Sequence, residues 1–207
     1  MSTGGKLKRE DFVDAAFELA AESGALGFTM RSLGEKMGID PTTVYRYYPS
    51  KDALVVAMVG RLMAERFAPE MLDLPPRERI LAVARVARTT LLENPEMAMA
   101  VVSVTEMAET TATSEVVIDA LEELGLSGRS LVLFYQLIEG MIIGTTVFDS
   151  GGSPTNWETR AGRYRSFGYR PFTEVAKQGP DAVEAAAEEA LLLGLATVLD
   201  AVEAHSA

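Results

Sequence analysis

The sequence predicts an all-α protein of about nine helices, with a three-helix helix-turn-helix domain at its N-terminus and a larger helical domain after it. Apolar residues recur at spacings of three and four along most of the chain, and no segment alternates as a strand does. Residues suited to cap a helix, such as Thr29, Asp40 and Ser50, stand directly before these segments. Apolar residues make up 48% of the 207 residues, which is enough for a sizeable core.

Four helices are expected near the N-terminus, at about residues 8–23, 30–37, 41–47 and 51–67. Gly24 and Gly38 follow the first two, because glycine accepts the left-handed conformation that commonly ends a helix. Pro41 suits the first turn of the third helix, where its missing N–H costs nothing. Pro49 ends that helix. The first helix has one apolar face, made by Phe12, Ala15, Ala16, Leu19 and Ala20.

Five further helices are expected, at about residues 76–92, 95–109, 114–124, 128–148 and 180–204. Residues 149–180 are rich in glycine, proline, arginine and aromatic residues and show no clear periodicity, so we predict a long irregular connection there. We place the domain boundary after residue 52. This gives an N-terminal domain of residues 1–52 and a C-terminal domain of residues 53–207.

Residues 131–148 are long and apolar enough to suggest a membrane span, and Gly140 and Gly144 form a G-x-x-x-G pair. Glu139 near the centre of the stretch and the lack of a basic flank argue against insertion. We therefore expect a helix covered by protein, and no membrane partner. The absence of cysteine and of an apolar leader fits a cytoplasmic location.

The charge of the chain is distributed unevenly. The net charge is −11, yet residues 1–52 carry seven basic and eight acidic side chains and are almost neutral. The remaining residues carry 12 basic and 22 acidic side chains, which a phosphate backbone would repel. Any face that binds nucleic acid is therefore expected in the N-terminal quarter.

Residues 29–51 carry the sharpest functional pattern. Two short helices are separated by Gly38-Ile39-Asp40, a turn that lets the second helix cross the first. Arg46 can read guanine with two hydrogen bonds, and threonine methyl groups can pack on thymine. On spacing alone, a plain three-helix packing unit stays an alternative to DNA binding. The outward positions of the second helix hold groups suited to a major groove: Thr42, Thr43, Tyr45, Arg46 and Tyr47.

Phosphate contacts are expected at helix N-termini, where free N–H groups and the helix dipole favour an anion. Thr29 and Arg31 lie at the start of the first short helix, and Lys51 lies at the start of the fourth helix. These three side chains would position the domain on the duplex without reading its sequence.

The stretch FTMRSLGEKMGIDPTTVYRYYPSKDALVVAMV resembles the N-terminal domain of the tetracycline-repressor (TetR/AcrR) family, over about residues 8–60. The resemblance implies backbone contacts from Thr29, Arg31, Lys51 and Tyr47. Tyr48 stands where the family usually has phenylalanine and should pack inward with Leu33, Val44 and Leu54. The resemblance also implies a recognition helix that includes Pro41, Thr42, Thr43, Tyr45 and Arg46.

Two positions depart from the family pattern. Lys8 stands where a capping threonine is frequent, and Tyr47 stands where histidine is common. At the level of function, the resemblance implies a ligand-responsive repressor that binds a palindromic double-stranded DNA operator as a dimer. A small apolar effector would release it. The C-terminal domain is then a helical ligand-binding and dimerisation domain.

The helices expected at 128–148 and 180–204 are too apolar on every side to face water, and large exposed apolar patches are rare on monomers. The family forms dimers through its last two helices. We therefore expect a homodimer, with burial inside one subunit as the alternative. Small residues would let partner helices approach: Gly140, Gly144, Ala187, Ala190 and Gly194.

A small-molecule pocket is expected among the helices at 51–67, 76–92, 95–109 and 128–148. Methionine adapts to varied ligand shapes, although at helical spacing it is more often a core residue. Glu139 is either a polar anchor of the ligand or a surface or interface acid, and Trp157 is a candidate lid. The predicted lining is Met63, Met97, Val101, Val104, Met107, Phe134, Tyr135, Ile138 and Met141.

A basic and aromatic patch at residues 160–170 is expected to bridge to acidic groups of a partner subunit, with a second DNA contact as the alternative. Its residues are Arg160, Arg163, Tyr164, Arg165, Tyr169 and Arg170. Catalysis has no candidate constellation. The single histidine, His205, lies near the C-terminal end, and no glycine loop has phosphate-binding spacing. We expect no enzyme activity, no cofactor and no metal. A helical protein-interaction module is the remaining alternative to a DNA-binding regulator.

Overall fold

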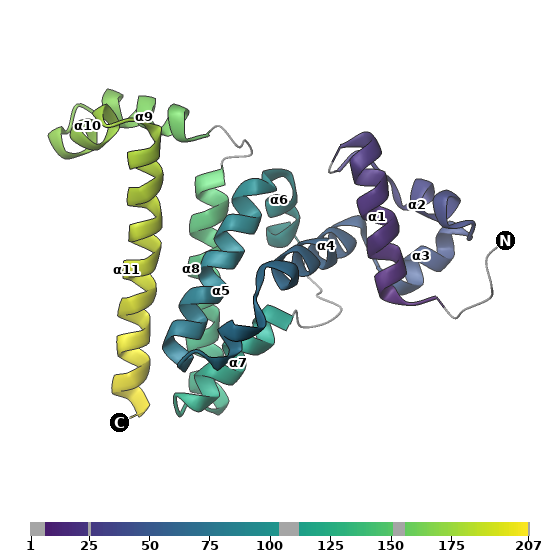
Figure 1. Ribbon diagram of the computed structural model, residues 1–207, viewed down its shortest axis with the longest axis horizontal. Helices are drawn as coiled ribbons and strands as arrows, with labels where there is room; N and C mark the ends of the chain where they lie inside the picture. Colours follow the sequence, from purple (N-terminus) through teal and green to yellow (C-terminus); the bar gives the residue numbers. More distant parts are fainter. Residues whose placement is uncertain (1–6, 25, 104–111, 151–155, 207) are drawn as a thin grey trace.

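The computed structural model describes residues 7–24, 26–103, 112–150 and 156–206. These residues form eleven α-helices and one short 3-10 helix, with no strand among them, which confirms the all-α fold (Figure 1). The helices are α1 (Arg9–Ser23), α2 (Met30–Met37), α3 (Pro41–Tyr47), α4 (Lys51–Arg66), η1 (Pro69–Asp73), α5 (Pro76–Glu93), α6 (Pro95–Ser103), α7 (Ala112–Glu123), α8 (Gly128–Ser150), α9 (Asn156–Ser166), α10 (Arg170–Lys177) and α11 (Pro180–Ser206).

The N-terminal domain is built around one apolar cluster. Phe12 of α1, Leu33 of α2, Val44 of α3 and Leu54 of α4 are fully buried in it. Met97 of α6 belongs to the same cluster, so α4 and α6 connect this domain to the rest of the chain. In Figure 1 the domain projects to one side, and α4 runs from it into the C-terminal bundle.

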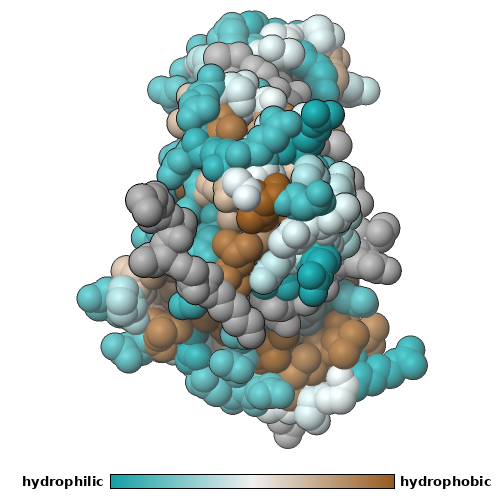
Figure 2. Space-filling model, turned by 90° about the vertical axis from the view of Figure 1, so that its right-hand side faces the viewer, coloured by the Kyte–Doolittle hydropathy of each residue, from teal (hydrophilic) through white to brown (hydrophobic). Residues whose placement is uncertain are grey.

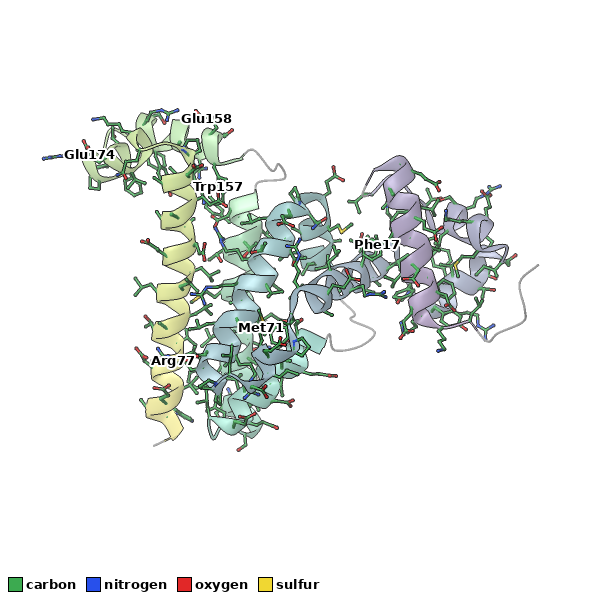
Figure 3. The ribbon with its side chains drawn as sticks, viewed as in Figure 1. Phe17, Met71, Arg77, Trp157, Glu158 and Glu174 are labelled. Carbon is green, nitrogen blue, oxygen red and sulfur yellow. The ribbon has the colours of Figure 1, made fainter. Side chains whose placement is uncertain are left out.

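The C-terminal domain surrounds α5, which packs on α7 and α8, while α11 runs beside α8 (Figure 1). Ile80, Ile138, Leu191, Leu195 and Leu199 are among the residues of this second cluster. Arg77 of α5 reaches across to α11 (Figure 3), where it lies 2.7 Å from Asp200 and 3.2 Å from Glu203. These ion pairs raise the pKa of Arg77 above its ordinary value, mainly through the hydrogen bond with Asp200.

The prediction of an irregular connection over residues 149–180 is wrong. Two helices, α9 and α10, occupy most of it and lie at the N-terminal end of α11 (Figure 1). Their core is small, with Ala161, Ala176 and Val183 buried together. The two helices are short, at 11 and 8 residues, so neither presents a long apolar stripe in the sequence. Trp157 packs at the edge of this core (Figure 3).

A buried charge cluster joins three helices of the C-terminal domain. Asp149 of α8 accepts a hydrogen bond of 2.7 Å from Arg88 of α5 and another from Arg160 of α9. The three side chains are 94–95% buried. Arg160 was expected to reach a partner subunit, but the structure places its guanidinium on Asp149 of its own chain.

The turn between α2 and α3 brings two backbones into close contact at Gly34. A Cβ atom at this position would lie 3.0 Å from the carbonyl oxygen of Ile39 and 3.2 Å from Cα of Pro41. Gly38 ends α2 in the left-handed conformation, at φ 67°. Glycine at these two positions therefore permits the sharp turn that sets α3 across α2.

We predict that Gly34→Ala lowers the free energy of unfolding by about 1–3 kcal/mol, because the added methyl meets backbone that has little room to move. The helix-forming advantage of alanine, about 1 kcal/mol, works in the opposite direction. Urea unfolding followed by circular dichroism measures the difference. Gly162→Ala is the matched control, because a Cβ there would lie 3.7 Å from the nearest atom, a guanidinium nitrogen of Arg165. A Gly34→Ala variant as stable as the Gly162→Ala variant would contradict the close contact.

Candidate nucleic-acid interface and ligand pocket

The start of α3 is fixed by its N-cap, Asp40. The carboxylate accepts hydrogen bonds from the hydroxyl of Thr42 at 2.6 Å and from the backbone N–H of Thr42 at 2.8 Å. The hydroxyl bond, followed by the backbone bond, lowers the pKa of Asp40 below its ordinary value. Asp40 therefore stays charged near neutral pH, as the N-terminus of a helix favours.

The outer face of α3 carries polar and aromatic side chains with few partners of their own. Thr42, Tyr45 and Arg46 are exposed, Tyr45 to 52%, whereas Val44 is fully buried. Thr43 is half-buried. Within the described part of the chain, Arg46 makes no ion pair or hydrogen bond. The guanidinium is therefore available to a partner outside the subunit.

Tyr47 does not share this outward face. Its ring is half-buried, with its centroid 4.5 Å from that of Phe12, and its hydroxyl donates a 3.1 Å hydrogen bond to the carbonyl oxygen of Leu7. The prediction that Tyr47 points outward with Tyr45 is therefore wrong for the free protein, because the side chain joins α3 to α1. Tyr48 is buried, as expected from its place in the pattern.

The three expected phosphate contacts differ in their surroundings. Thr29 caps α2, and its hydroxyl accepts from the N–H of Ser32 at 3.0 Å. Arg31 is exposed and pairs with Glu35 at 3.0 Å. Lys51 is half-buried over the ring of Phe28 and donates to the carbonyl oxygen of Leu26 at 2.5 Å. Lys51 is thus partly engaged inside the domain.

A cavity of about 440 Å³ lies in the C-terminal domain. Most of its lining residues recur at spacings of three or four along a helix, so each helix presents one face to the cavity. The residues that line it are Val56, Val59, Gly60 and Met63 of α4; Val83, Ala87 and Leu91 of α5; Val101 of α6; Thr113, Ser114 and Val117 of α7; and Tyr135, Ile138, Glu139, Ile142 and Ile143 of α8.

The polar groups of this cavity gather between α7 and α8. The hydroxyl of Tyr135 donates a 2.9 Å hydrogen bond to Oε1 of Glu139. Burial raises the pKa of Tyr135, a hydrogen bond with Ser114 opposes this, and Glu139 adds to the rise. The phenol therefore stays protonated and acts as a donor at neutral pH. The cavity is an apolar chamber with one hydroxyl and carboxylate cluster, which is the composition of a small-molecule site.

Seen from the side of the N-terminal domain, the surface is largely hydrophilic, with hydrophobic residues in patches toward the centre and the lower part of the view (Figure 2).

Residues 12–58 match the family model described as bacterial regulatory proteins, tetR family. The transcriptional repressor Rv1353c of Mycobacterium tuberculosis is 28% identical over 152 residues, which cover 70% of this chain and 58% of the relative. The chain thus spans less than two thirds of the length of that relative. The class A tetracycline repressor protein from transposon 1721 of Escherichia coli is 26% identical over 197 residues, covering 94% of this chain and 90% of the relative.

The N-terminal part of the chain, residues 12–58, belongs to the tetR family of bacterial regulatory proteins.

Solved structures of regulators share the fold of the whole chain. BioQ with its double-stranded DNA operator aligns with a TM-score of 0.55 at 20% identity, covering 97% of this chain and 100% of BioQ. ActR of Streptomyces coelicolor in complex with (S)-DNPA aligns with a TM-score of 0.62 at 15% identity, covering 98% of this chain and 100% of ActR. At these identities the likeness shows the fold alone.

Four of the nine predicted ligand residues line the cavity: Met63, Val101, Tyr135 and Ile138. Three others lie elsewhere. Met97 is buried in the core of the N-terminal domain, Phe134 packs on His205, and Met141 faces Gly194 of α11. Val104 and Met107 lie outside the described residues. The position of Met141 also shows that Gly194 serves a contact within the subunit.

Several cavity residues were missed by sequence reasoning, although a signal for them exists. Val83, Ala87 and Leu91 recur at spacings of four on α5, and Val56, Val59 and Met63 form a similar stripe on α4. Such stripes look identical whether they face a core or a cavity. Trp157, the candidate lid, is not among the lining residues and lies in the first turn of α9 (Figure 3).

We predict that the cap of α3 weakens as the pH falls through about 4, the ordinary range of an aspartate. The folded-state pKa of Asp40 is lowered, so its stabilisation is present above the unfolded-state pKa and is lost as the pH falls through the folded-state pKa. Asp40→Asn keeps a capping side chain that does not titrate. The wild type should therefore lose more thermal stability between about pH 5 and pH 3 than Asp40→Asn. Equal losses in parallel thermal melts would contradict the role of this carboxylate.

Proposed function

We propose that this protein is a ligand-responsive transcriptional repressor, which binds a palindromic DNA operator as a homodimer and is released by a small apolar effector. One observation carries the proposal: α3 presents an unpaired Arg46 beside the exposed Tyr45 and Thr42, on a helix whose other side is buried. An ordinary exposed turn of a helix more often carries glutamate and lysine side chains. The repressor Rv1353c and the operator complex of BioQ support the same function.

In this proposal α3 enters the major groove. Arg46 reads guanine through two hydrogen bonds, and the methyl groups of Thr42 and Thr43 pack on thymine. Pro41 and Tyr45 complete the contact surface. Thr29, Arg31 and Lys51 hold the phosphate backbone on either side. Tyr47 contributes a phosphate contact only if its hydroxyl leaves Leu7 when DNA binds.

Dimerisation would occur through α8 and α11, which leave an apolar face uncovered in one subunit. On α8, Gly140 and Gly144 face open space, and a Cβ added to either would have no atom within 4 Å. The stretch Gly128–Asp149 is apolar and long enough to cross a membrane, and only 17% of it is buried within the subunit. The exposed apolar side chains on the two helices are Val132, Leu133, Leu137, Phe148 and Leu193.

We propose that a second copy, and not lipid, covers this face. The other side of α8 carries Glu139 at the cavity and ends at Asp149, which is buried between two arginines. Charged groups of this kind are costly in a bilayer, so they favour a protein covering. The protein would then act in the cytoplasm, as a regulator and without catalysis.

The coupling between effector and operator would pass through α4. This helix begins at Lys51, beside α3, and lines the cavity from Val56 to Met63. An effector that binds better when α4 is displaced would shift the two recognition helices of a dimer. Their separation would then no longer fit half-sites about one or two turns of DNA apart.

Selection from random duplexes, followed by fluorescence anisotropy on the recovered sequence, tests operator binding. We expect an inverted repeat. Arg46→Ala should weaken binding by about 1–3 kcal/mol and relax the preference at one base pair of each half-site. Arg85→Ala is the matched control, because Arg85 is an exposed arginine of α5. No enriched sequence, or equal binding by the Arg46→Ala and Arg85→Ala variants, would contradict the proposal.

Analytical ultracentrifugation tests the dimer. The wild type should sediment as a dimer at micromolar concentration, and Leu137→Glu with Leu193→Glu should shift it toward monomer by placing carboxylates in an apolar contact. Leu72→Glu alters a leucine of η1 that is 51% exposed, close to the 54% of Leu137, and should leave the dimer intact. A monomeric wild type would exclude the proposed contact.

A further inference from the structure

We propose that the cavity takes a cationic amphiphile, an apolar body with one ammonium group that sits against the carboxylate of Glu139. The inference deepens the proposed function by giving the charge of the effector. Its consequence for DNA release depends on that function, whereas the binding preference itself depends only on the cavity.

The charge of the cavity is one-sided. Among the described lining residues Glu139 is the only acidic one, and none of them is a lysine or an arginine. The carboxylate is half-buried, and no described cation lies within ion-pair distance of it. An anionic ligand would therefore meet a carboxylate without a compensating cation.

The hydrogen bonds of the cluster leave room for a cationic donor. The hydroxyl of Tyr135 engages Oε1 of Glu139, and no hydrogen bond to Oε2 is formed by the described residues. A carboxylate away from water is stabilised by a charged, hydrogen-bonding partner. An ammonium group supplies both. The ring of Tyr135 adds a surface that attracts cations.

The remaining walls specify the body of the ligand. Valine, isoleucine and leucine side chains of α4, α5 and α8 surround a cavity of about 440 Å³. Such walls offer dispersion contacts and no hydrogen bonds, so they favour an alkyl or aryl group. Thr113 and Ser114 also line the cavity, and Ser114 lies at the end that holds Tyr135 and Glu139. The polar end of the ligand is therefore expected there.

Three probes with one alkyl chain and different heads test the proposal: decylammonium, 1-decanol and decanoate. Isothermal titration calorimetry on the full chain measures their affinities. We expect decylammonium to bind about 10-fold to 100-fold more tightly than 1-decanol, the range of a hydrogen bond to a charged group, and decanoate to bind most weakly. A preference for 1-decanol or decanoate, or no binding of decylammonium, overturns the proposal.

Glu139→Gln tests the residue directly, because it removes the charge while preserving the shape and a hydrogen-bond acceptor. The preference for decylammonium over 1-decanol should fall to within about threefold, a difference small beside that of a charged hydrogen bond. Glu122→Gln is the matched control. It removes one exposed carboxylate from α7, so it reports any effect of the net charge of −11 alone. If both variants keep the preference, Glu139 is not the anchor and the proposal fails.

A cooperative thermal melt confirms that each variant is folded, and the order of the three probes on the wild type is decisive by itself. The outcome is separable from that of the proposed function. If the protein binds selected operator DNA but prefers 1-decanol, the proposal of a cationic ligand fails and the proposed repressor function stands. If it prefers decylammonium but selects no DNA, the proposal of a cationic ligand stands and the proposed repressor function fails.

Discussion

The orientation of α3 depends on the contact between Gly34 and the backbone of residues 39–41. That contact, with Gly38 in the left-handed conformation, sets α3 across α2. The buried side chains of Val44 and Tyr48 then fix which side of α3 faces outward. Because Val44 and Tyr48 are held in the core, the side chains of Tyr45 and Arg46 point away from it. The surface offered to DNA is therefore a result of packing beneath it.

The same dependence continues into the C-terminal domain through α4. Leu54 and Met58 of this helix are fully buried in the N-terminal core, whereas Val56 and Met63 line the cavity. One face of α4 thus packs in the N-terminal core, and another face of the same helix lines the cavity. At the far end of the domain, Asp149 ties α5, α8 and α9 together through two arginines. The cavity lies between a helix connected to α3 and helices held by buried charges.

Local rules predicted the N-terminal domain well. The limits expected for α2 and α3 agree with the structure, because caps, glycines and prolines act within a few residues. Helical spacing could have placed Tyr47 inward, because it lies three residues after the buried Val44 and so on the same face of α3. Its contact with Phe12 of α1 is a tertiary contact, which such rules do not predict. The same rules did not find α9 and α10, which are only 11 and 8 residues long. The sequence predicted which helices surround the cavity but only some of the residues that line it. An apolar stripe on a helix looks the same whether it faces a core or a cavity.

The chain has no cysteine, so a single introduced cysteine carries a chemical probe to one site. Iron–EDTA attached to Tyr45→Cys measures most directly whether α3 lies in the groove of duplex DNA. Strand cleavage should be confined to two positions related by the symmetry of the operator. No cleavage is expected from the same probe at Leu72→Cys, an exposed position on η1 outside the dimer contact. Cleavage that is absent or spread evenly from position 45, under conditions where the protein binds the duplex, would contradict the account.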